Sequence, residues 1–166
     1  YLQAVRGATR RVVIANAYFF PGYRFIRELR RAARRGVDVC LILQGEPDMP
    51  IVKTAASLLY HHLTKAGVRI YEYCERPLHG KVAVVDDDWS TVGSSNLDPL
   101  SLTLNLEANL VIRDAAFAQG LAARLQDLID NHCKSIAPEP PAPPWAFWRP
   151  LSSFLMFHLP SGYSRC

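Results

Sequence analysis

The sequence predicts an α/β fold, with helices packed on the faces of a mixed, largely parallel sheet. Three observations support it. The chain has 166 residues, 49% of them hydrophobic, which is enough for one buried core. Short β-branched runs alternate with amphipathic helical stretches as far as residue 73, a pattern typical of parallel sheets. Two short apolar runs then flank an acidic turn, which indicates an added hairpin.

The first part of the chain predicts three strands separated by helices. Each expected helix carries an apolar stripe at helical spacing, and Gly36 and Gly67 follow two of them as C-terminal caps. The expected elements are a helix ending near residue 10, strand Val12–Asn16, helix Arg24–Arg35, strand Val37–Leu43, helix 51–66 and strand Val68–Tyr73.

The second part predicts a hairpin, one more strand and a long helix. Strands Lys81–Asp86 and Ser90–Gly93 flank the acidic turn, and a further strand follows over Glu107–Ile112. Asp114 is placed to cap a helix over residues 115–131.

A change of composition near residue 137 divides the chain. Residues 1–136 are expected to form one domain. Residues 137–166 begin with a Pro-rich, extended linker and continue as an aromatic tail with few charges. Such a tail suits a membrane interface, and the alternative is that it packs back on the domain.

Positive charge is concentrated at the start of the chain. Residues 1–36 contain nine Arg and one acidic residue, Glu28. This favours an anionic partner such as phospholipid head groups, a membrane surface or nucleic acid. The alternative is the solvated face of an Arg-rich helix. The four cysteines are scattered without a C-x-x-C pair, which favours reduced thiols over a zinc site or a disulfide framework.

The most specific motif is His79-x-Lys81-x-x-x-x-Asp86, followed shortly by Gly93-Ser-Ser-Asn96. Side chains two residues apart on a strand point to the same face, so His79 and Lys81 should lie together. Asp86 has the opposite parity, and we expect it to be a structural partner rather than a lining residue of the same pocket.

Two further polar series accompany the motif. Ser94 and Asn96 are spaced by two residues, as are Asn105, Glu107 and Asn109 within an otherwise apolar stretch. Polar groups in such surroundings need partners when they are buried. We expect these series to converge with the His79 segment at one end of the sheet.

These residue types suit phosphodiester chemistry that needs neither a metal nor a cofactor. A neutral imidazole such as that of His79 can attack phosphorus, and Lys81 would hold the phosphate as a point charge. Ser94 and Asn96 would add hydrogen bonds. Glu107 would accept the proton of the far imidazole nitrogen and so fix the tautomer.

The motif resembles the signature of the phospholipase D superfamily. Over roughly residues 1–135 the chain looks like the C-terminal half of bacterial cardiolipin synthases, those of the B type in particular. The segments that carry this likeness are Tyr18-Phe-Phe-Pro21, Arg31-Ala-Ala-Arg-Arg-Gly-Val-Asp38, Gly93-Ser-Ser-Asn-Leu-Asp-Pro-Leu-Ser101 and Leu104-Asn-Leu-Glu-Ala-Asn109.

The resemblance implies an α-β-α sandwich for each half, with the site between two halves. It implies that His79 and Lys81 are catalytic, that Asp86 completes the motif, and that the other members of the site occupy supporting positions. Those supporting residues are Ser94, Asn96 and Glu107.

Family members use two such motifs, and this sequence has one. His132-Cys-Lys134 repeats only H-x-K, without the later Asp or G-S-x-N, and we interpret it as a chance match. His61 and His62 lie on an expected helix without motif context, which predicts surface or packing roles. The chain also starts without Met, so we expect a piece of a longer protein. The second histidine would come from an N-terminal half or from a second copy of the chain.

The expected function is therefore that of a cardiolipin synthase acting through a phosphohistidine, with phosphatidylglycerol and an anionic membrane surface as partners. The expected location is the cytoplasmic side of a bacterial cell membrane, as a peripheral protein. Two alternatives stay open. One is a homodimeric phosphodiesterase or nuclease of the same superfamily, although nucleic acid is not the expected partner. The other is a lipid-binding half-domain that lacks the groups for turnover.

Overall fold

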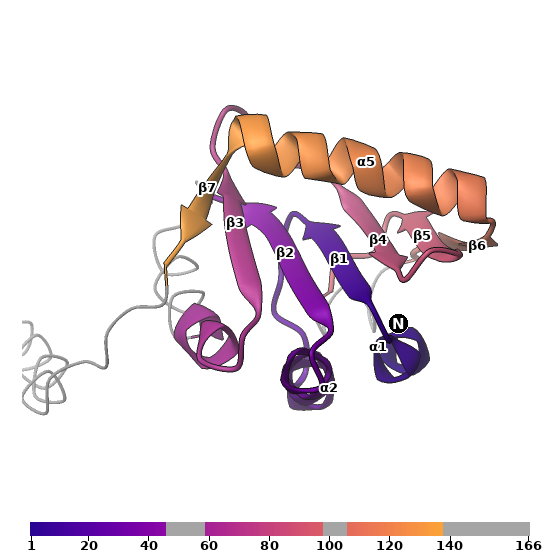
Figure 1. Cartoon of the computed structure of the whole chain (residues 1–166). Coiled ribbons are helices and arrows are strands. Elements are labelled where there is room, and N and C mark those ends of the chain that lie inside the picture. Colours follow the sequence, from indigo (N-terminus) through magenta and orange to yellow (C-terminus); the bar gives the residue numbers. More distant parts are fainter. Residues whose placement is uncertain (46–58, 98–105, 138–166) are drawn as a thin grey trace, which may run out of the picture.

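The computed structural model describes residues 1–45, 59–97 and 106–137. In this part of the chain, a seven-stranded sheet lies between two layers of helices (Figure 1). The long helix α5 covers one face, and α1, α2 and a helical segment over residues 59–64 cover the other. The predicted α/β sandwich is confirmed. Part of the expected helix 51–66 and the tail from residue 138 lie outside the described residues.

The observed elements follow the predicted order. Most bounds differ from the expected ones by a few residues, as is usual for helix and strand ends. They are α1 (Leu2–Gly7), β1 (Arg11–Asn16), α2 (Tyr23–Arg34), β2 (Asp38–Gln44), β3 (Arg69–Tyr73), β4 (Lys81–Val85), β5 (Trp89–Gly93), β6 (Asn109–Arg113), α5 (Ala115–His132) and β7 (Cys133–Ile136).

The sheet is parallel at its core and antiparallel at its flanks. The strand order is β6-β5-β4-β1-β2-β3-β7, with β1, β2 and β3 mutually parallel. These three strands are the ones that alternate with helices, so the expected parallel pairing is found where the crossovers are. The hairpin β4–β5 and strand β6 continue the sheet in antiparallel fashion beyond β1.

Strand β7 was not expected from the sequence. It pairs antiparallel with β3 at the sheet edge and begins directly after α5, so no turn residue separates the two elements. Its four residues are too short a run to give an alternating pattern.

Alternation along the strands divides the core into two layers. On β1, Val12 and Ile14 pack with α1 and α2, whereas Ala15 belongs to the cluster that includes α5. The same alternation on β4 gives Ala83 to the first layer and Val84 to the second. Lys81 shares the parity of Ala83, so its side chain leaves the sheet on the side of α1 and α2. None of the described helices is long and apolar enough to cross a membrane.

Candidate functional site

His79 and Lys81 come together where β4 begins. Lys81 is the first residue of β4 and is only 6% exposed, whereas His79 lies in the preceding loop and is exposed. The Lys81 Nζ atom is 3.1 Å from His79 Nε2 and also donates to the His79 carbonyl oxygen at 3.4 Å. The predicted pairing of these two side chains is confirmed. Because Lys81 is the partner of Asn16 in the β1–β4 pairing, we call this end of the sheet the site edge.

The contact fixes how the imidazole is presented. When Lys81 is an ammonium it has only donors, so it donates to His79 Nε2, and the neutral ring then carries its proton on Nδ1. The lone pair at Nε2 therefore faces the cation that would hold a phosphate. Burial lowers the pKa of Lys81, and the negative charge of Glu107 opposes part of that lowering. Glu107 precedes β6 in the chain, and its negative charge acts on the Lys81 ammonium.

Asn16 is a member of the site edge that the sequence reasoning missed. It ends β1, is fully buried, and accepts a hydrogen bond at its Oδ1 from Leu97 N at 3.5 Å. Its Nδ2 has no hydrogen-bond partner among the described residues, and neither has the buried Oδ1 of Asn96. Unpaired buried amides are costly and mark positions where a ligand would complete the bonding. The available signal was a polar residue closing the apolar run of β1.

The segment after β5 uses Ser94 and Ser95 differently. Ser94 N donates to the Ala108 carbonyl oxygen at 2.9 Å, and Ala108 N donates to the Ser94 hydroxyl at 3.0 Å. Ser94 therefore ties the end of β5 to the start of β6. Ser95 is buried, and its hydroxyl accepts from the Asn109 side-chain amide. Both contacts join the end of β5 to the start of β6, but neither links a member of the Ser94 and Asn96 series to a member of the Asn105, Glu107 and Asn109 series. The convergence of these series with the His79 segment stays a prediction, and Asn105 lies outside the described part.

Gly93 is required by the close approach of β5 and β6. A Cβ at this position would lie 2.5 Å from the Ala108 carbonyl oxygen and would collide with the Asn109 side chain. We expect Gly93→Ala to reduce the free energy of unfolding by about 1–3 kcal/mol, because backbone must move. Gly120→Ala is the control, since that glycine lies exposed in α5 with open space around it and should gain up to about 1 kcal/mol. Denaturant unfolding of both variants measures the difference, and equal stability would contradict this geometry.

Asp86 lies at the other end of β4, about 17 Å along the strand from Lys81. Its carboxylate accepts hydrogen bonds from the backbone N–H groups of Thr9, Arg10 and Arg11 at 2.8–3.2 Å, and from the Thr9 hydroxyl at 3.1 Å. Burial alone would raise the pKa of Asp86, but these hydrogen bonds hold it below its usual value. Asp86 thus fastens the start of β1 to the β4–β5 turn, as its parity predicts.

An apolar cavity of about 550 Å³ opens beside the site edge. Phe25 of α2 and Leu97 line it, and Ser95 and Asn109 give it a polar end. Arg24 lies at the same cavity and contributes a positive charge. The position joins an apolar wall to the polar groups that follow β5.

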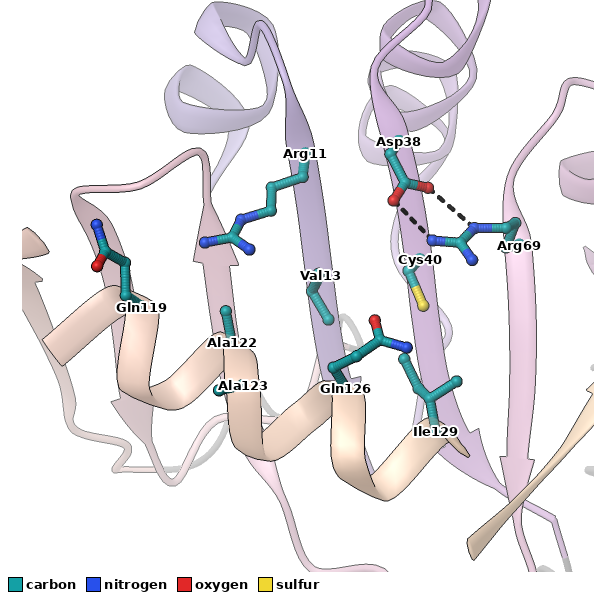
Figure 2. A pocket seen from close by; sticks show the side chains of 10 residues that line it. All are labelled: Arg11, Val13, Asp38, Cys40, Arg69, Gln119, Ala122, Ala123, Gln126 and Ile129. Atoms are coloured by element: carbon teal, nitrogen blue, oxygen red, sulfur yellow. Dashed lines mark hydrogen bonds and ion pairs between the residues drawn. The ribbon is translucent and has the colours of Figure 1, made fainter. Parts of the chain in front are cut away.

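A second cavity, of about 330 Å³, lies under α5 at the opposite end of β1 and β2 (Figure 2). Its charged groups are already paired: Arg69 binds Asp38 through two hydrogen bonds of 2.9 and 2.6 Å, and Arg11 pairs with Asp87. Burial raises the pKa of the Cys40 thiol at its floor to about 12, so this cysteine stays a thiol. Nothing in this cavity matches the chemistry of the site edge.

A family model and individual relatives of known sequence both match this chain, and they point to the same family. The family model described as "Cardiolipin synthase, PLD-like domain" matches residues 1–129. Cardiolipin synthase B of Salmonella typhi is 60% identical over 158 residues, and that of Escherichia coli K12 is 57% identical over the same length. Each alignment covers 95% of this chain and 38% of the relative, so the chain spans well under half the length of these proteins.

Among solved structures, the phospholipase D family member Nuc of Salmonella typhimurium has a similar fold. The TM-score is 0.69 at 23% identity, over 81% of this chain and 87% of Nuc. At this identity the likeness describes the fold.

Proposed function

Because the chain belongs to the PLD-like domain family of cardiolipin synthases, we propose that it is the C-terminal half of such an enzyme and supplies one of its two catalytic histidines. The proposed reaction transfers a phosphatidyl group from one phosphatidylglycerol to another and releases glycerol. The single observation that carries the proposal is the contact between His79 Nε2 and the buried Lys81 ammonium at the site edge.

In the first step, the Nε2 lone pair of one histidine attacks the phosphorus of phosphatidylglycerol, forming a P–N bond. The P–O bond to the head-group glycerol breaks, and the second histidine protonates the departing oxygen. The products are glycerol and a phosphatidyl-histidine intermediate. His79 is one of these two histidines, and its Nε2 faces the side on which Lys81 would hold the phosphate.

In the second step, the histidine that gave up its proton takes one from a hydroxyl of another phosphatidylglycerol. That oxygen attacks phosphorus, the P–N bond breaks, and cardiolipin leaves with both histidines restored. No net proton is consumed. The reaction needs only imidazoles and hydrogen-bond donors, which fits the residue types of the site.

The remaining site residues have supporting roles in this proposal. Lys81 neutralises the non-bridging phosphate oxygens, and the unpaired Nδ2 of Asn16 adds a donor from β1. Asn96 contributes a side-chain amide whose Oδ1 is unpaired among the described residues, and Glu107 balances the charge of Lys81. Ser94 holds β5 against the start of β6, and Asp86 holds the scaffold.

The proposed substrate also accounts for the cavity beside the site edge. Its apolar wall suits the upper acyl chains of a phospholipid, while Ser95 and Asn109 lie at its polar end. We propose that the enzyme works as a peripheral protein at the cytoplasmic face of a bacterial membrane.

The test uses a chimera in which this chain replaces the segment that it matches in cardiolipin synthase B of E. coli K12. We expect the chimera to convert phosphatidylglycerol into cardiolipin and glycerol in equal amounts, measured by lipid mass spectrometry and a glycerol assay. A folded chimera that leaves phosphatidylglycerol unchanged but cleaves DNA would overturn the proposal in favour of a nuclease.

A further inference from the structure

Four basic side chains gather on the face of the sheet opposite α5, and we call them the basic cluster. Arg30 and Arg34 belong to α2, His62 belongs to the helical segment over residues 59–64, and Lys65 follows that segment. Arg30 Nη1 lies 2.6 Å from His62 Nε2, which joins the two helices. Both helices lie on the same side of the sheet in Figure 1, the 59–64 segment in magenta.

Three neighbouring arginines of α2 have partners within the fold. Arg27 and Arg31 pair with the buried carboxylate of Glu28 at 3.6 and 3.1 Å. Arg35 donates to three backbone carbonyl oxygens at the end of α1. By contrast, no carboxylate of the described residues forms an ion pair with any member of the basic cluster.

The basic cluster therefore stores electrostatic repulsion. Arg30 and Arg34 are four residues apart on one helix, where like charges destabilise each other. Partial burial, with the charges of Arg30, Arg34, His61 and Lys65, lowers the pKa of His62. The Nε of Arg30 is buried without a partner among the described residues. A bound anion would relieve the repulsion and accept hydrogen bonds from the exposed side chains of Arg34 and Lys65.

We propose that the basic cluster binds the phosphate groups of anionic phospholipids and holds this face of the protein against a membrane. The inference rests on the proposed function, because an enzyme whose substrates are phospholipids works at their surface. Arg30 and Arg34 offer the planar guanidinium donors that suit phosphate oxygens, and Lys65 adds a point charge. The basic cluster is spread over two outward-facing helices, which suits a broad surface of head groups.

Binding of an anion should be linked to protonation of His62. The groups that act on this imidazole are Arg30 and Arg34 from α2, His61 from its own segment and Lys65 directly after it, all basic. A nearby phosphate reverses their effect and favours the charged imidazole. Affinity should therefore rise as the pH falls through the titration range of His62, and His62→Gln should weaken this dependence.

The experiment is co-sedimentation of the full 166-residue chain with vesicles of phosphatidylcholine, with and without phosphatidylglycerol. Vesicle binding needs no turnover, so the result is independent of whether the chain supports cardiolipin formation. We expect Arg30→Gln/Arg34→Gln to weaken binding to the anionic vesicles about thirtyfold, at roughly fivefold for each charge removed. Binding to phosphatidylcholine alone, where the aromatic tail is the candidate contact, should not change.

Two control variants define the outcome. Arg113→Gln/Arg124→Gln removes the same charge from exposed positions on β6 and α5 and should bind like the parent. Arg30→Lys/Arg34→Lys keeps the charge and should recover most of the affinity. Equal binding by Arg30→Gln/Arg34→Gln and the parent would overturn the proposal. Duplex DNA binding is measured in parallel. If Arg30→Gln/Arg34→Gln lost affinity for DNA but not for the anionic vesicles, the basic cluster would be a nucleic-acid surface and the proposal would also be overturned.

Discussion

Replacing His79 by Ala in the chimera is expected to lower the rate of cardiolipin formation by at least about 10³-fold. The variant removes the imidazole whose Nε2 faces Lys81, and none of the other described histidines contacts Lys81. Lys81 remains to hold phosphate, so substrate binding should fall much less than turnover. Initial rates with phosphatidylglycerol vesicles, together with vesicle co-sedimentation, separate the two effects.

His132→Ala is the matched control for His79→Ala. His132 also begins an H-x-K sequence, but it ends α5 and its Nδ1 pairs with Glu75 Oε1 at 2.8 Å. It therefore lies beside β3 and β7, away from β4, and its removal should leave the rate of cardiolipin formation nearly unchanged. A His79→Ala chimera with near-normal product would exclude His79 from the chemistry.

The second large effect is expected for Asp86→Ala, and it should be an effect on stability. The substitution leaves three backbone N–H groups and one hydroxyl without their charged acceptor, and it places Ala at a φ of +51°. Hydrogen bonds to charged groups and the left-handed backbone together suggest a loss of about 3–5 kcal/mol in the free energy of unfolding. Denaturant unfolding measures it. Asp88→Ala, an exposed position in the same turn, is the control and should cost little.

The stability lost in Asp86→Ala should be largest at neutral pH and smaller in acid. The folded-state pKa of Asp86 is lower than its unfolded value, so its stabilisation is complete above about pH 4. The carboxylate's stabilisation should disappear as the pH falls through the folded-state pKa. The difference in stability between the parent and Asp86→Ala should then shrink to the part that comes from the left-handed backbone. Under conditions where it stays folded, the chimera that carries Asp86→Ala should keep much of its cardiolipin-forming activity. Loss of turnover at unchanged stability would show instead that Asp86 takes part in the chemistry.

The local part of the site could be predicted from the sequence because it depends on spacing along one short segment, although His79 lies just before β4 rather than on it. The spacing of two between His79 and Lys81 required a common face, and the 3.1 Å contact confirms it. The odd spacing to Asp86 separated it from this pair, and the structure places it at the far end of β4. Neither inference needed any knowledge of the other strands.

The parts that depend on pairing between distant strands could not be predicted in this way. Asn16 reaches the site edge only because β1 pairs antiparallel with β4, 65 positions further along the chain. Ser95 was not among the expected site residues, and its contact with Asn109 depends on how β5 and β6 come together. Strand β7 is defined by its contact with β3 rather than by its own four residues.

The central claim is that this chain contributes one histidine of a two-histidine site. It is tested most directly by comparing cardiolipin formation by the isolated chain, kept monomeric and checked by light scattering, with formation by the chimera. The account predicts vesicle binding without turnover for the monomer, and steady production of cardiolipin by the chimera that depends on His79. Robust turnover by the strictly monomeric chain would contradict it.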